Sequence, residues 1–146
     1  MKAGVLFVDD EPDNVATAVS VLQGSLGVPV EAVETVEAAV ALLVARPWAV
    51  VVMDLFIPLG DHPQRVLGAR AVRFQEHVQH LGGLILLEEI ARLPEPRPVV
   101  VSHTACTDHV LLDLFGDQVL RRIPKPAPLD TLLHNLAEVM AALEAR

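Results

Sequence analysis

The chain has 146 residues, of which 52% are hydrophobic, with a mean hydropathy of +0.44, a formal net charge of −8 and a pI near 5.1. This length suits one well-buried domain and is too short for two. The acidic balance excludes a protein that binds a nucleic-acid backbone through its own charge. The single cysteine, Cys106, excludes an intrachain disulfide and suits a reducing cytoplasm. No signal peptide precedes the first apolar run, and no run approaches the ~20 residues of a membrane span.

Short apolar runs alternate with helical spacing along the first half of the chain. The runs at 4–8 and 28–33 predict strands, and the valine-rich run that begins at 49 predicts a strand buried on both faces. Between them, apolar residues recur at helical spacing over 15–22 and 36–43. We expect a turn at 24–29, an N-cap at Thr35 and a helix end before Pro47.

The second half continues the alternation. Helices are predicted over 83–93, from about 108 to Gly116, and over 130–145, with strands at 99–101 and 119–123. Five strands that alternate with five helices indicate right-handed βαβ units, and hence an α/β domain with a parallel sheet covered on both faces.

Polar residues follow four of the five predicted strands. In such sheets, ligands bind beyond the carboxyl ends of the strands, so these side chains are expected to converge. Clustered carboxylates repel one another unless a hard divalent cation such as Mg²⁺ neutralises them. With a lysine nearby, the set could hold a phosphoryl group during transfer to a carboxylate. The residues are Asp9, Asp10, Asp54, Ser102, His103, Thr104 and Lys125.

Five motifs in this order resemble the receiver (CheY-like) domain of two-component response regulators. They are V-D-D-E at 8–11, V-V-M-D-L-F-I-P at 51–58, G-G-L-I-L-L-E-E-I at 82–90, H-T-A at 103–105 and P-K-P at 124–126. The resemblance covers nearly the whole chain, residues 1–146, as a single domain. It implies a flavodoxin-like doubly wound (βα)₅ sandwich whose sheet has the order 2-1-3-4-5.

The resemblance also implies roles for individual residues. Asp54 would be the phospho-acceptor, Asp10 a direct Mg²⁺ ligand, and Asp9 a ligand acting through water. The backbone carbonyl of Phe56 would complete the metal shell. Lys125 would pair with the acceptor or its phosphoryl oxygen, and Lys125-Pro126 would be a candidate cis bond.

The hydroxyl residue that the family places near the acceptor has two candidates. If the fourth strand keeps its period of two, Ser102 and Thr104 face one side and His103 the other. Thr104 followed by Ala105 fits the family pattern better, so we favour Thr104. The spacings back to Pro98 and forward to Lys125 fall between the two candidates.

The segment 60–81 departs from the family as an insertion after the acceptor strand. Its middle has helical spacing, and Arg70, Arg73, His77 and His80 form a basic stripe beside the apolar one. One interpretation is a solvated surface helix. The other is that the stripe binds an acidic partner, or that the insertion shields the phosphoryl group.

The fifth strand departs as well. The chain has no tyrosine, and Arg121 and Arg122 occupy the region where the family commonly has an aromatic residue before the lysine. Either an arginine replaces the aromatic residue, or the domain signals by another route. With Arg70 and Arg73, we take Arg122 as a candidate for partner contact.

The resemblance implies a stand-alone, cytoplasmic signalling domain rather than a turnover enzyme. It would accept a phosphoryl group from a sensor histidine kinase or phosphotransfer protein, and it would act on a downstream protein target, with no direct contact to nucleic acid or membrane. One alternative is a phosphorylation-independent pseudo-receiver that serves as an interaction module. Another is a small Mg²⁺-dependent phosphohydrolase, although residues 55–57 lack the second carboxylate that such chemistry needs.

Overall fold

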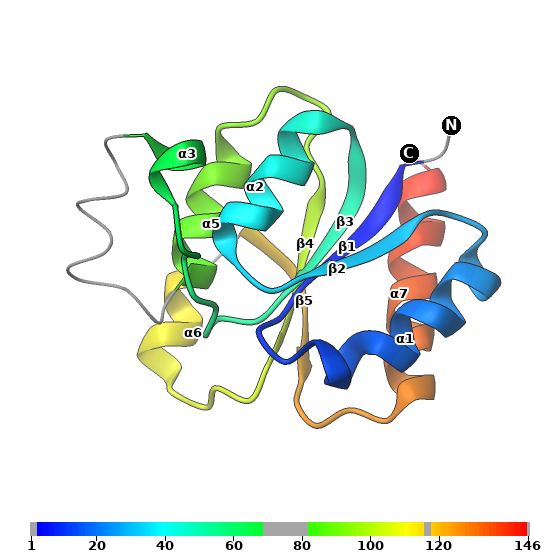
Figure 1. Ribbon diagram of the computed structural model, residues 1–146. Coiled ribbons are helices and arrows are strands. Elements are labelled where there is room, and N and C mark those ends of the chain that lie inside the picture. The colour runs from blue at the N-terminus through cyan, green and yellow to red at the C-terminus, as the bar shows by residue number, and fades with distance from the viewer. Residues whose placement is uncertain (1–2, 69–81, 116–117, 146) are drawn as a thin grey trace.

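A computed structural model describes residues 3–68, 82–115 and 118–145. Five parallel strands form one sheet in the order β2-β1-β3-β4-β5, which confirms the predicted strand number and order (Figure 1). The strands are β1 Gly4–Val8, β2 Val30–Val33, β3 Trp48–Met53, β4 Val99–Thr104 and β5 Val119–Pro124.

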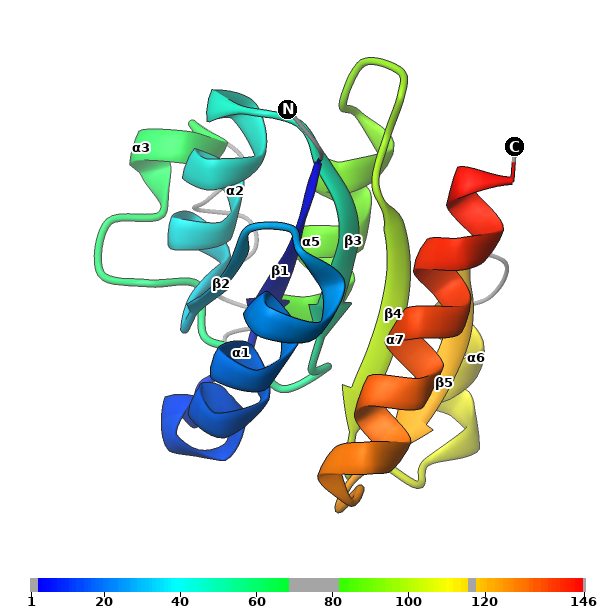
Figure 2. The same ribbon diagram turned by 90° about the vertical axis from the view of Figure 1, so that its right-hand side faces the viewer.

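Helices cover both faces of the sheet. α1 and α7 pack together on one face, and α2, α3, α5 and α6 lie on the other (Figures 1 and 2). None of the helices within the described ranges is long and apolar enough to cross a bilayer. Their bounds are α1 Pro12–Leu26, α2 Val36–Ala45, α3 Gln64–Leu67, α5 Gly82–Ala91, α6 His109–Phe115 and α7 Leu129–Glu144.

The alternation of side chains along the central strands divides the core in two. On β1, Val5 and Phe7 pack beneath α1 and α7, whereas Leu6 and Val8 pack beneath α2 and α5. The strand β3 repeats the pattern, and its residues 50–53 are at most 2% exposed. Full burial of such side chains stabilises a fold by about 1.5–3 kcal/mol each, so this pattern holds the strands in register.

The amino end of α2 is capped from two directions. The Thr35 hydroxyl accepts from the Ala38 N–H at 3.1 Å, as predicted. The chain that follows β3 supplies the carbonyls of Pro58 and Leu59 to the N–H groups of residues 36 and 37. Both partners satisfy donors that a helix leaves unpaired. The N–H of His62 also donates to Glu37 Oε2 at 3.0 Å, which ties the beginning of segment 60–81 to α2. Within that segment, Leu67 of α3 is 2% exposed.

The structure corrects two boundaries. α1 continues through Gly24 to Leu26, so the predicted turn at 24–29 begins too early, and Gly27 ends the helix at a φ of +65°. The apolar spacing continues to Leu26, which packs on the core and outweighs the ~1 kcal/mol cost of a helical glycine. The fourth strand does not end at Val101 but runs to Thr104, because β5 pairs with it that far.

Two glycines let α5 approach the backbone behind β3. The N–H groups of Gly82 and Gly83 donate to the carbonyls of Ile57 and Leu55 at 2.9 and 3.0 Å. A Cβ on Gly83 would lie 2.7 Å from the Asp54 carbonyl oxygen and 2.8 Å from the Leu55 Cα. A side chain therefore cannot be added at Gly83 without moving α5 or the backbone around Asp54.

We expect Gly83→Ala to lower the free energy of unfolding by about 1–3 kcal/mol, because the added methyl group overpacks a backbone contact. Gly24→Ala is the matched control, since a Cβ there meets nothing within 4 Å and should raise the stability by about 0.5–1 kcal/mol. Denaturant unfolding of both variants measures the difference. Equal stabilities would contradict the close approach.

Candidate functional site

Four polar residues at the carboxyl edge share one side of the sheet. Four strand residues, one each from β1, β3, β4 and β5, belong to the core beneath α1 and α7: Phe7, Val52, Val101 and Ile123. Side chains two positions further along an extended chain point to the same side. The residues at those positions are Asp9, Asp54, His103 and Lys125.

Lys125 joins the carboxylates that follow β1 and β3. Its Nζ lies 2.6 Å from Asp9 Oδ2 and 2.9 Å from Asp54 Oδ2. Burial disfavours the charged ammonium, but the hydrogen bonds and negative charges of both aspartates outweigh burial, so the pKa of Lys125 lies above its ordinary value. The structure therefore brings together three of the predicted site residues, two carboxylates and the ammonium that lies between them.

Asp10 adds a third carboxylate to Asp9 and Asp54. Oxygens of the three side chains lie within 4.8 Å of one another, and Asp10 is the exposed member. Partial burial, followed by the charges of Asp9, Asp54 and Glu11, raises the pKa of Asp10. Carboxylate oxygens are the ligands that Mg²⁺ prefers, so this donor set fits such an ion.

Backbone groups orient the two buried carboxylates. The N–H of Phe56 donates to Asp54 Oδ1 at 3.3 Å, and the N–H of Glu11 donates to Asp9 Oδ1 at 2.9 Å. Phe56 itself is 40% exposed. Its carbonyl as a metal ligand stays a prediction. The cis bond expected between Lys125 and Pro126 is present.

Ser102 and Thr104 continue the set of alternating β4 residues that packs in the core beneath α2 and α5. Val100, two residues before Ser102, packs beneath α2 and α5, and Ser102 pairs with Met53 of that same core. Both hydroxyl residues are buried, and the Thr104 hydroxyl accepts from the Cys106 N–H at 3.3 Å. Their proposed roles beside the acceptor stay predictions.

His103 was expected at this edge from the sequence, but no role was assigned to it. It is 8% exposed, and its Nδ1 lies 2.9 Å from the Ile123 carbonyl oxygen. It lines a cavity of about 410 Å³ together with Lys125 and residues 105, 126 and 127. The spacings to Pro98 and Lys125, which fall between Ser102 and Thr104, were the signal that could have identified it.

The two arginines of β5 contact different helices. Arg121 donates from Nη1 to Glu138 Oε2 of α7 at 2.8 Å, and Arg122 donates to the Leu112 carbonyl of α6 at 3.0 Å. Arg122 thus connects β5 to α6 and remains exposed. The other predicted contact residues, Arg70 and Arg73, and the rest of the basic stripe lie outside the described residues.

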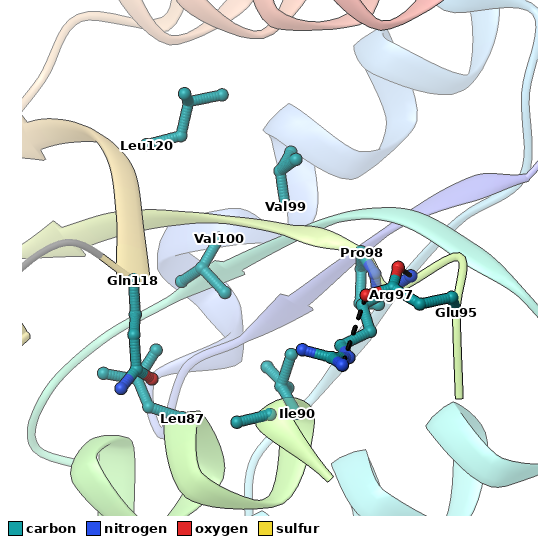
Figure 3. A pocket seen from close by; sticks show the side chains of 10 residues that line it. Leu87, Ile90, Glu95, Arg97, Pro98, Val99, Val100, Gln118 and Leu120 are labelled. Carbon is teal, nitrogen blue, oxygen red and sulfur yellow. Dashed lines mark hydrogen bonds and ion pairs between the residues drawn. The ribbon is translucent and has the colours of Figure 1, made fainter. Parts of the chain in front are cut away.

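Another cavity, of about 310 Å³, lies at the opposite end of β4. Figure 3 shows Leu87 and Ile90 of α5 on one side of it and Leu120 of β5 on the other. Glu95, Arg97 and Pro98, which precede or begin the strand, also line it. This cavity is therefore separate from the carboxylate cluster at the carboxyl edge.

Asp10→Asn should raise the melting temperature at pH 7 in the absence of divalent ions. A carboxyl group whose pKa is raised by folding lowers the stability of the folded state once it ionises. The increase in melting temperature should therefore be complete at neutral pH and should vanish as the pH falls below the ordinary aspartate pKa of 3.8. Thermal unfolding at several pH values measures this. MgCl₂ should raise the melting temperature of the native chain more than that of the variant. A larger increase in the variant would contradict the cation site.

No protein-family model matches the chain, and no curated protein matches its sequence. Solved structures do resemble it. A CheY-like receiver domain protein from Methanospirillum hungatei JF-1 is 18% identical with a TM-score of 0.76, covering 99% of this chain and 98% of that one. The signal receiver domain of an HD domain-containing protein from Pseudomonas fluorescens Pf-5 is 17% identical with a TM-score of 0.72, covering 99% and 90%. A CheY-like receiver domain from Methylobacillus flagellatus is 18% identical with a TM-score of 0.64, covering 95% and 99%. The chain therefore has the fold of the CheY-like response-regulator receiver domains.

Proposed function

We propose that this chain is a phosphorelay receiver. It accepts a phosphoryl group on Asp54 from the phosphohistidine of a sensor histidine kinase or phosphotransfer protein, with Mg²⁺, and then signals by binding another protein. The observation that carries the proposal is the ammonium of Lys125 held between Asp9 and Asp54 at the carboxyl edge of a receiver fold. The nearby Asp10 completes a set of oxygens suited to the cation.

The residues present supply what the transfer requires. A carboxylate oxygen of Asp54 forms a bond to phosphorus as the phosphorus–nitrogen bond of the donor breaks. Asp9, Asp10 and Asp54 would hold Mg²⁺, which would offset the negative charge of the phosphoryl oxygens. Lys125, partly buried and positively charged, provides a cation beside those oxygens without rearrangement of solvent.

Transfer of the phosphoryl group to Asp54 changes the group that Lys125 contacts. The added charge and oxygens compete with the Lys125–Asp54 ion pair and so favour a different arrangement of the ends of β4 and β5. Arg122 of β5 is hydrogen-bonded to α6, which exposes Val110 by 71% and Leu114 by 57%. We infer that this surface of α6 and β5 contacts the downstream protein.

The proposal is tested by weighing the intact protein after incubation with acetyl phosphate or phosphoramidate, with and without MgCl₂. We expect a Mg²⁺-dependent gain of one phosphoryl mass in the native chain and none in Asp54→Asn. Asp113→Asn removes an exposed aspartate of α6 and should gain the mass normally. If the folded native chain gains no mass, the acceptor role is wrong and a phosphorylation-independent interaction module becomes the better account.

A further inference from the structure

We propose that His103 is the general base for hydrolysis of the phosphoryl group on Asp54 and so sets the lifetime of the phosphorylated state. This inference rests on the proposed phosphorylation of Asp54. It concerns a buried side chain that the transfer step itself does not use. Four observations support it: the strand register, the hydrogen bond of the imidazole, the shared cavity and the placement of the two neighbouring hydroxyls.

The register of β3 and β4 brings His103 to the level of Asp54. The two strands pair from Val50 with Val99 to Met53 with Ser102. One step further along both chains are Asp54, which directly follows β3, and His103 of β4; neighbouring strands of a sheet lie about 4.8 Å apart. Paired residues of parallel strands point to the same side, and the preceding same-side pair, Val52 with Val101, packs in one core.

The hydrogen bond of His103 determines which ring nitrogen can accept a proton. A carbonyl oxygen only accepts, so the 2.9 Å contact with Ile123 requires a hydrogen on Nδ1. In the neutral ring, Nε2 then carries the free lone pair. Lys125, the other polar residue that lines this cavity within the described part of the chain, is a charged donor and has no lone pair to offer.

The cavity beside Lys125 has room for the attacking water. His103 and Lys125 line the same space of about 410 Å³, and Lys125 Nζ lies 2.9 Å from Asp54 Oδ2. A water molecule needs only a small fraction of that volume and two or more polar partners. Water in this cavity can therefore contact the side chain of His103 beside the lysine that binds the acceptor carboxylate.

The neighbouring hydroxyls are placed less well for this task. Ser102 pairs with Met53, one residue before the acceptor, and is in phase with the core beneath α5. Thr104 is in the same phase as Ser102, and its hydroxyl accepts from the Cys106 N–H. His103 alone of the three shares the phase of Asp54.

The hydrolytic step then follows from these positions. A water oxygen forms a bond to phosphorus while Nε2 of His103 takes one of its protons. The bond between phosphorus and the Asp54 oxygen breaks, which regenerates the carboxylate and releases inorganic phosphate. The imidazolium returns its proton to solvent, so water is the only co-reactant.

The test measures the decay of the phosphorylated protein by intact mass after removal of excess acetyl phosphate. His103→Ala should gain the phosphoryl group normally but lose it at least 10-fold more slowly, since a general base contributes about 10²–10⁴-fold. Free imidazole should restore the decay in proportion to its concentration, because the variant leaves space for it. The same imidazole should change the native decay little.

Two further variants complete the design. His103→Gln keeps an N–H that can reach the Ile123 carbonyl but has no basic nitrogen, so it should also decay slowly and serves if the alanine variant does not fold. His109→Ala removes an exposed histidine at the start of α6 and should decay at the native rate.

Loss of the phosphoryl group at the native rate in either folded His103 variant would overturn the inference. Failure of these variants to gain the phosphoryl group would also overturn it, because phosphorylation of Asp54 does not need a base for hydrolysis. A native chain that never gains the group would instead overturn the proposed function, and this inference with it.

Discussion

The site depends on one partly buried positive charge, the ammonium of Lys125. Lys125 Nζ contacts the carboxylates of Asp9 and Asp54, each less than 10% exposed, which follow two different strands. An unpaired carboxylate in such surroundings would be costly, and loss of one partner from a buried ion pair typically costs 3–5 kcal/mol. The same pairing keeps the lysine charged and beside the acceptor, so the interaction that stabilises the edge of the sheet also prepares it for an incoming anion.

The core and the site are parts of one pattern. Along β1, β3, β4 and β5, every second side chain packs beneath α1 and α7. At the carboxyl end of each of these strands, the next residue of that alternating set is polar. A slip of one residue in any strand would bury polar side chains and remove one group from the site. The glycine contact of α5 behind Asp54 holds the acceptor strand from the other face. Packing therefore determines the chemistry at the edge.

Much of this could be predicted from the residues themselves. Valine-rich runs and helical spacing indicated five strands and their helices, and the carboxylates and lysine at strand ends indicated where they would meet. The end of the fourth strand could not be predicted, because Ser102, His103 and Thr104 look like a loop until the ladder to β5 is known. The register between β3 and β4 depends on a second ladder of backbone hydrogen bonds, between those two strands, so the level of His103 relative to Asp54 could not be predicted either. The segment 60–81 is described only through Gly68, and its basic stripe stays a prediction.

The most direct measurement locates the modified residue. Reduction of the phosphorylated protein with borohydride converts an aspartyl phosphate to homoserine, which fragment mass spectrometry can assign to a position. The account predicts homoserine at residue 54 and unchanged aspartate at 9 and 10, since those two carboxylates bind the lysine and the cation. Homoserine at 9 or 10, with residue 54 unchanged, would contradict it.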